Sequence, residues 1–125
     1  VENNSIKIEK FINDISIPYS AADIVISRAG ALAISELTFM GKAMILIPFP
    51  QAAEDHQFLN AKSIEEQNAC KLIKQQDLST GKLELYIKKL LCNEASLKML
   101  ENNSKNISKP NATKIISNEI IRCIS

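Results

Sequence analysis

The chain lacks several features that would indicate common functions. It has no tryptophan, two tyrosines and four phenylalanines, so it offers no aromatic platform on which single-stranded nucleic acid could stack. Fifteen basic and fourteen acidic residues leave a net charge of +1, which predicts no nucleic-acid or polyanion partner. No apolar run reaches the length of a membrane span. The first residues also lack the basic and then apolar pattern of a signal peptide.

Cysteine and histidine are also scarce. The three cysteines, Cys70, Cys92 and Cys123, are odd in number and form no CxxC pair. This predicts reduced, mostly buried thiols in a cytosolic protein. The single histidine, His56, has no second histidine or cysteine at metal-ligand spacing, so we expect no metal site and no cofactor. A G-x-S-x-G turn is absent as well, which argues against a serine hydrolase.

Short apolar strands alternate with amphipathic helices along the chain. The patterns predict strands at 6–11, 24–27, 44–48 and 70–73. They predict helices at 31–40, 56–67, around 83–91, 94–102 and 112–124. A loop or short helical turn is predicted to begin at residues 13–15, and residues 18–22 are a predicted connector. Asp55, and either Asp77 or Ser79, are candidate helix caps, and Gly41 is a candidate helix stop. At 125 residues the chain is one domain or part of one, and the alternation predicts a parallel α/β sheet.

The turn after the strand at 24–27 is the first candidate binding site. Ser27-Arg28-Ala29-Gly30 leads directly into a predicted helix. The first N–H groups of a helix have no partner within it, and the helix dipole favours an anion, so such a turn can bind phosphate. Gly30 allows a ligand to approach closely, and Glu36 has the carboxylate that holds ribose hydroxyls in other nucleotide sites. The alternative is an ordinary strand–helix turn followed by a surface glutamate.

A second candidate follows the strand at 44–48. Gln57 and Asn60 are three residues apart, so they share a helix face, and their amides can both donate to and accept from sugar hydroxyls. The alternative is a pair of solvated polar residues. His56 is a candidate base or donor, or a residue of the first helical turn without a chemical role. Because the carboxyl ends of parallel strands meet at one edge, both candidates and the turn after Phe11 should converge on one ligand.

Together these segments resemble a known family. The motifs are Ser27-Arg28-Ala29-Gly30-Ala31-Leu32 with Ser35-Glu36, then Ile47-Pro48-Phe49-Pro50 and Asp55-His56-Gln57-x-x-Asn60-Ala61. They resemble the MurG family of bacterial transferases, in glycosyltransferase family 28, from about residue 6 to the C-terminus. The resemblance implies the GT-B fold of two Rossmann-like domains. Residues 1–125 would be part of the C-terminal, UDP-sugar-binding domain, a parallel-sheet α/β layer sandwich.

The resemblance also implies an activity and a set of contacts. Enzymes of this family transfer N-acetylglucosamine from UDP-N-acetylglucosamine to lipid I, forming lipid II in peptidoglycan synthesis. Ile12 would meet the uracil through its backbone, and Glu36 would hold the ribose. Ala31, Leu32 and Ala33 would line the helix N-terminus that holds the diphosphate and faces the sugar, and Arg28 and Gly30 belong to the turn before it. Gln57, with Asn60 nearby, would contact the sugar hydroxyls.

Three of these positions leave alternatives open. Some relatives carry glutamine at the position of His56, and threonine is common at the position of Ala33. Arg28 would either support the phosphate loop or only brace the turn.

The same resemblance implies what these residues do not supply. The N-terminal acceptor domain, with the general base, is not among them, so we expect no catalytic residue here and no activity from the chain alone. The parent enzyme would be cytoplasmic, peripheral on the inner face of the plasma membrane. Two alternatives are the donor-binding subunit of a split UDP-N-acetylglucosamine transferase and a degenerate nucleotide-binding domain. The split family resembles Ser-His-Ala-Gly at the turn, whereas this chain has Ser27-Arg28-Ala29-Gly30.

Overall fold

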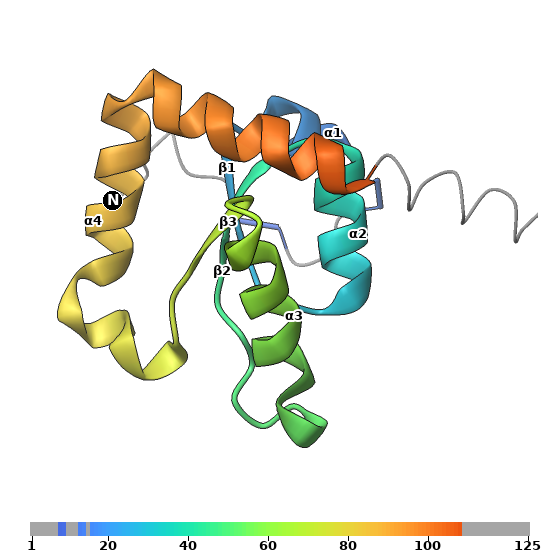
Figure 1. Ribbon diagram of the computed structural model, residues 1–125, viewed down its shortest axis with the longest axis vertical. Helices are drawn as coiled ribbons and strands as arrows, with labels where there is room; N and C mark the ends of the chain where they lie inside the picture. Colours follow the sequence, from blue (N-terminus) through green and yellow to red (C-terminus); the bar gives the residue numbers. More distant parts are fainter. Residues whose placement is uncertain (1–7, 10–12, 15, 109–125) are drawn as a thin grey trace, which may run out of the picture.

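A computed structural model describes residues 8–9, 13–14 and 16–108 of the chain. Several predicted features lie outside these residues, namely the helix at 112–124, Ile12, Cys123 and most of the strand at 6–11. Helices and strands alternate within the described part (Figure 1). They are α1 (Ser16–Ala21), β1 (Ile24–Ser27), α2 (Ala31–Phe39), β2 (Ala43–Leu46), α3 (His56–Glu66), β3 (Cys70–Leu72) and α4 (Lys82–Cys92). Two 3₁₀ turns, η1 (Ala53–Asp55) and η2 (Gln75–Thr80), and a final helix at 94–108 complete them.

The three described strands form one parallel sheet in the order β1-β2-β3. Val25 pairs with Met44, and Met44 pairs with Cys70, so the strands are in close register. Every residue of β2 is buried, as expected of a central parallel strand. The parallel α/β sheet predicted from the alternation of elements is confirmed, with three strands described.

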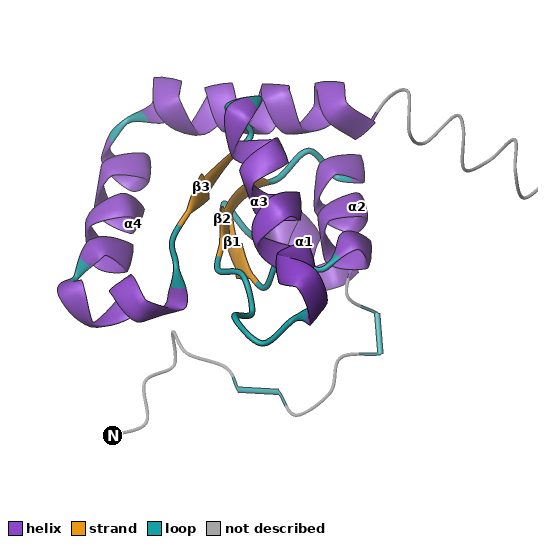
Figure 2. Cartoon of the chain, turned by 60° about the horizontal axis from the view of Figure 1, so that its bottom comes forward, coloured by secondary structure: helices purple, strands orange, loops and turns teal. Residues whose placement is uncertain are grey.

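Helices cover both faces of the sheet (Figure 2). Alternate residues of β2 point to opposite faces, so Met44 and Leu46 join one core while Ala43 and Ile45 join the other. The first core also holds residues of α2 and α3, such as Leu37 and Ile64. The second core holds Leu90 of α4 and Leu100 of the helix at 94–108. Because a core packs against each face of the sheet, the sheet holds the loops at the carboxyl ends of its strands in position.

The end of α2 shows why the chain turns where it does. Gly41 has a φ of +65°, a conformation that glycine adopts without steric cost. The Gly41 N–H donates to the Thr38 carbonyl and the Lys42 N–H to the Leu37 carbonyl, which is the hydrogen-bond pattern of a Schellman cap. The predicted stop at Gly41 is therefore confirmed.

Several predicted details are wrong. Residues 16–21 form helix α1 instead of a connector. The Lys42 ammonium donates to the carbonyls of Ser20 and Ala22, so the C-terminal end of α1 is capped from another element. Pro18 and the alanines that follow it predict a connector, whereas the contact with Lys42 joins segments about twenty residues apart. The helix predicted at 94–102 continues to 108.

The predicted N-cap position of α3 is confirmed, and that of α4 is wrong. Asp55 stands at the N-cap position of α3, but its φ is 55° and its side chain makes no capping hydrogen bond. Asp77 and Ser79 lie inside the η2 turn, and α4 begins after Gly81, whose φ is 78°. In both cases the residue at the N-cap position has a left-handed backbone and makes no side-chain capping hydrogen bond.

Candidate functional site

The N-terminus of α2 opens outward at the carboxyl edge of the sheet. The Ile34 N–H donates to the Gly30 carbonyl at 3.0 Å, so the N–H groups of residues 30–33 precede the first bond of the helix. Ala31 and Leu32 are exposed, and Leu32 is 74% exposed. Gly30 has a φ of −69°, so its conformation does not require glycine. A Cβ there would meet Gln57 Nε2 at 3.9 Å, an ordinary contact, so the fold alone does not require glycine and the close approach of a ligand remains a prediction.

Gln57 and Asn60 hold this turn in place. The Ala29 N–H donates to Gln57 Oε1 at 3.3 Å, and the Phe49 N–H donates to the same oxygen at 2.9 Å. Asn60 Nδ2 donates to the Ala29 carbonyl at 3.2 Å. Gln57 Nε2, the donor end of the same carboxamide, lies on the side of Gly30. Both amides therefore brace the candidate phosphate turn, and sugar recognition by them remains a prediction.

Arg28 braces the neighbouring loop. Its Nη1 donates to the carbonyls of Ile47 at 3.3 Å and Pro48 at 3.4 Å. Its guanidinium carbon lies 5.5 Å from the centre of the Phe49 ring, within the range of a cation–π contact. Of the two roles considered for Arg28, these contacts favour bracing, because they tie the turn after β1 to the loop after β2.

Glu36 and Tyr19 are electrostatically coupled. Glu36 is half-buried on α2, one turn after Ala33. Burial raises the pKa of the Tyr19 phenol on α1, and the Glu36 carboxylate raises it further. Tyr19 also packs against the core that α2 covers. Sequence patterns do not indicate Tyr19 as a neighbour of Glu36, because they predict a connector for its segment.

His56 lies at the exposed start of α3. Its Nε2 is 3.4 Å from Glu54 Oε2, and both side chains are largely exposed. Glu54 and Asp55, just before it, both have a φ of 55°. This contact gives His56 an acidic partner, and its chemical role remains a prediction.

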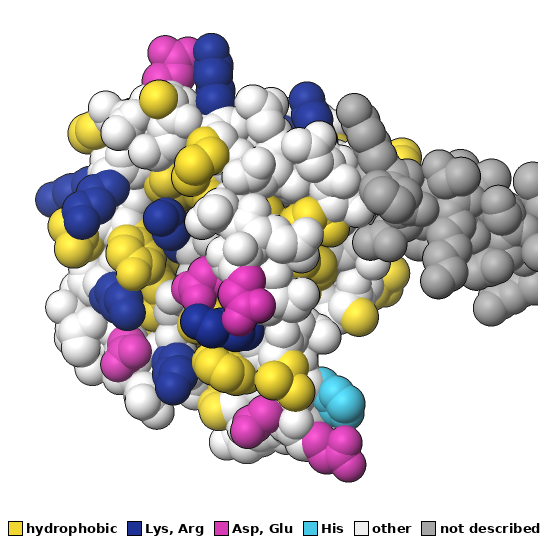
Figure 3. Space-filling model, viewed as in Figure 1, with side chains coloured by type: hydrophobic (Ala, Val, Ile, Leu, Met, Phe, Trp, Pro, Cys, Tyr) yellow, Lys and Arg dark blue, Asp and Glu magenta, His cyan; other side chains and the backbone are white. Residues whose placement is uncertain are grey.

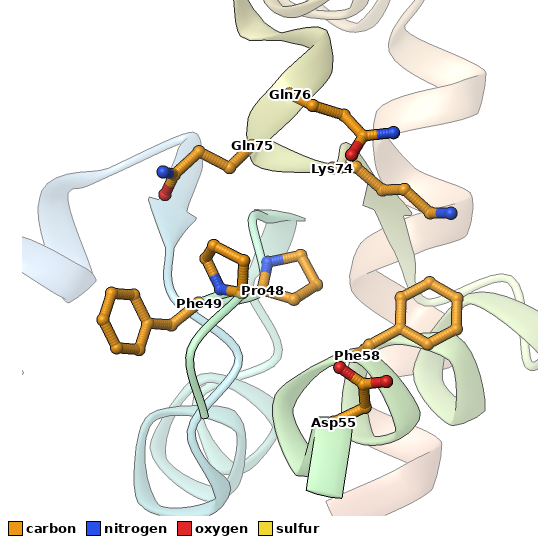
Figure 4. Close-up of a pocket in the computed structure, with 8 residues that line it drawn as sticks. Pro48, Phe49, Asp55, Phe58, Lys74, Gln75 and Gln76 are labelled. Atoms are coloured by element: carbon orange, nitrogen blue, oxygen red, sulfur yellow. The ribbon is translucent and has the colours of Figure 1, made fainter. Parts of the chain in front are cut away.

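A cavity of about 530 Å³ adjoins this edge of the sheet (Figure 4). One wall is Pro48, Phe49 and Pro50 of the loop after β2, and the others are Asp55 and Phe58 at the start of α3 and residues 74–76 after β3. Sequence reasoning missed it, because neither Phe58 nor residues 74–76 belong to a recognisable motif. The described residues hold no group of three or more side chains suited to a metal ion. Among these same residues, no helix has the length and apolarity needed to cross a membrane.

Comparison with known proteins decides the family. Residues 1–118 match the glycosyltransferase family 28 C-terminal domain. The chain belongs to this family. It is 42% identical over 113 residues to a protein of Caldicellulosiruptor saccharolyticus, and 41% identical over 120 residues to one of Flavobacterium psychrophilum. Both are named UDP-N-acetylglucosamine–N-acetylmuramyl-(pentapeptide) pyrophosphoryl-undecaprenol N-acetylglucosamine transferase.

A solved structure agrees with these matches. MurG of Acinetobacter baumannii superposes with a TM-score of 0.78 at 32% identity, over 93% of this chain and 35% of that one. The matches cover 90% and 96% of this chain but only 30% and 32% of the two relatives. The chain thus spans about a third of the length of these proteins. The resemblance to the MurG family and the predicted fold class are both confirmed.

Proposed function

We propose that this chain binds UDP-N-acetylglucosamine and forms the donor-binding part of an inverting transferase that makes lipid II from lipid I. The observation that carries the proposal is the open N-terminus of α2, with Gln57 beside it and Glu36 one turn further on. The names of the relatives support the same donor, and they name the acceptor as N-acetylmuramyl-(pentapeptide) pyrophosphoryl-undecaprenol.

The N-terminus of α2 has the chemistry that the leaving group needs. When the acceptor hydroxyl attacks the anomeric carbon, the bond to the diphosphate breaks and negative charge develops on UDP. Oriented N–H groups of residues 30–33 and the helix dipole stabilise that charge without a metal ion. Glu36 accepts hydrogen bonds from the ribose hydroxyls, and Gln57 Nε2 donates to the sugar or to a phosphate oxygen.

The acceptor side of the reaction needs groups beyond this site. His56 contacts Glu54 at 3.4 Å, and the resemblance to the family assigns no general base to this part of the chain. The base and the main acceptor contacts therefore come from a second domain, the acceptor domain of the family. With an acceptor that carries a lipid, the enzyme works peripherally on the inner, cytoplasmic face of the plasma membrane.

Calorimetric titration of the chain with UDP-N-acetylglucosamine tests the donor site, with UDP-glucose and UDP for comparison. We expect binding that prefers the N-acetyl sugar and weakens about tenfold in Glu36→Gln, which loses a charge-assisted hydrogen bond. Glu66→Gln makes the same change at an exposed position of α3 and should bind like the wild type. A folded chain that binds none of the three ligands would contradict the proposal and favour a degenerate domain.

A further inference from the structure

The cavity beside the donor site shares part of its wall with a second hollow. Phe58, Lys74 and Gln76 line both the 530 Å³ cavity and a neighbouring cavity of about 380 Å³. The second cavity runs between α3 and α4, where it reaches Lys82 and Tyr86. Each volume lies within the range of small-molecule sites, about 300–1,000 Å³. Two hollows that share a wall suit an extended ligand better than a single compact ring.

The walls of the two hollows combine apolar surface with charges of both signs. Figure 4 shows Phe49 on one side of the first cavity and Phe58 with Asp55 on the other, while Lys74, Gln75 and Gln76 lie across from them. Lys74 Nζ lies 5.2 Å from the centre of the Phe58 ring, and Lys82 Nζ lies 5.7 Å from that of Tyr86.

Asp77 lies in the second hollow, which also holds the ion pair of Lys62 with Glu65. On the molecular face drawn in Figure 3, acidic and basic side chains are interspersed with apolar ones instead of forming an area of one sign. A purely anionic ligand would meet carboxylates here, and a purely apolar one would meet lysines. The mixture fits a ligand with amides, apolar side chains and charges of both signs.

Hydrogen bonds to the Gln57 side chain link the first cavity to the donor site. The backbone N–H of Phe49, in its wall, and that of Ala29, in the turn before α2, donate to the same Gln57 oxygen. Asp55 lies two residues before Gln57 at the start of α3. A ligand in this cavity therefore lies at the same edge of the sheet as the sugar whose anomeric carbon reacts.

We infer that these two neighbouring cavities, which share Phe58, Lys74 and Gln76, bind the peptide of the acceptor. This inference rests on the proposed function. Lys74 pairs with a peptide carboxylate and Asp55 with a peptide cation. The carboxamides of Gln75 and Gln76 pair with backbone amides, and Phe49, Phe58 and the prolines contact apolar side chains. The acceptor is thus held partly by the domain that binds the donor.

The test uses the ¹⁵N-labelled chain and N-acetylmuramyl-pentapeptide, with N-acetylmuramic acid as the ligand that lacks the peptide. We expect amide shifts at residues 74–76 with the peptide compound alone, and affinity about two- to fivefold weaker in Lys74→Gln, the effect of one exposed ion pair. Lys88→Gln, which removes the same charge from an exposed position of α4 outside both cavities, should bind like the wild type.

Titrating the same samples with UDP-N-acetylglucosamine separates this inference from the proposed function. Donor binding without peptide binding overturns the inference and leaves the proposed function in place. Equal binding of both muramyl ligands, shifts elsewhere, or equal losses in Lys74→Gln and Lys88→Gln also overturn it. Peptide-dependent shifts at residues 74–76 without donor binding support the peptide site while contradicting the donor site.

Discussion

The carboxamide oxygen of Gln57 accepts hydrogen bonds from the backbone N–H of Ala29 at 3.3 Å, twenty-eight residues earlier in the chain. Because the same oxygen binds the Phe49 N–H, one side chain of α3 fixes both the turn after β1 and the loop after β2. Its nitrogen is left facing Gly30. The oxygen and the nitrogen of the Gln57 carboxamide therefore have separate roles, which substitutions can distinguish.

Gln57→Glu and Gln57→Leu should affect stability and binding differently. Glutamate keeps an oxygen for the two N–H groups but loses the Nε2 donor and adds a negative charge beside the diphosphate. Leucine leaves both N–H groups without an acceptor, and we expect it to lower the free energy of unfolding by about 1–2 kcal/mol. Urea unfolding measures this, and Gln57→Glu should stay closer to the wild type. Both variants should bind UDP-N-acetylglucosamine more weakly.

Equal destabilisation by the two substitutions would contradict the bracing role of the Gln57 oxygen. Wild-type donor affinity in Gln57→Glu would contradict the role of the Nε2 group.

The sequence predicts the parts of this site that depend on neighbouring residues better than those that depend on residues distant along the chain. The boundaries of β1 and of α2 follow from local patterns, an apolar run and then Gly30 and Gly41, and they are confirmed to within a residue. The bracing by Gln57 and Arg28 joins segments that are distant along the chain, and amide or guanidinium spacing does not reveal which carbonyl or N–H will lie opposite. Sugar recognition was the natural prediction for Gln57, since sequence spacing shows a shared face but no partner.

The cavities illustrate the same limit. Phe58 lies on α3 and Lys74 follows β3, and the packing of α3 against β3 brings Lys74 Nζ to 5.2 Å from the centre of the Phe58 ring. Neither residue forms part of a pattern with its neighbours in sequence. The expected side-chain caps of α3 and α4 are absent for a different reason: aspartate and serine favour N-cap positions on average, but the residues at the N-cap positions of both helices have a left-handed backbone here.

Gly41→Ala should be strongly destabilising. The φ of +65° alone costs an alanine about 1–2 kcal/mol, and an added Cβ would also overlap the side chain of Lys105 from the helix at 94–108. We expect a lower midpoint in urea unfolding. In a Lys105→Ala background, Gly41→Ala should cost less stability than in the wild type, because the overlap with the Lys105 side chain is gone. The cost of the left-handed backbone should remain. No loss of stability from Gly41→Ala in that background would show that the left-handed conformation carries no cost.

Cys70 should make stability depend on pH in the alkaline range. Burial, with a smaller effect of Glu65, raises the pKa of this thiol to about 12, whereas an unfolded thiol titrates near 8.5. Below about pH 8.5 both states keep the proton, so the thiol adds no pH dependence. As the pH rises further the unfolded state loses the proton first, and stability falls by up to about 1.4 kcal/mol per pH unit.

Urea unfolding between pH 8 and 10 measures this slope. Cys70→Ala should give a flatter dependence than the wild type, even though its stability is lower throughout because a buried side chain is truncated. Cys92→Ala, at an exposed position of α4, should run parallel to the wild type. Parallel curves for Cys70→Ala and the wild type would contradict the proposed titration.

Ser104→Ala should stabilise the chain. The Ser104 side chain is fully buried, and its hydroxyl oxygen has no hydrogen-bond partner among the described residues. An unsatisfied buried hydroxyl costs about 1–3 kcal/mol, and alanine removes it without adding volume. Ser108→Ala is the matched control, because that hydroxyl, on the same helix, donates to the Lys105 carbonyl at 3.0 Å. Both substitutions replace a serine of this helix by alanine, so a gain in thermal stability in Ser104→Ala but not in Ser108→Ala indicates the unsatisfied group. Equal changes in the two variants would show that the Ser104 hydroxyl is satisfied in solution.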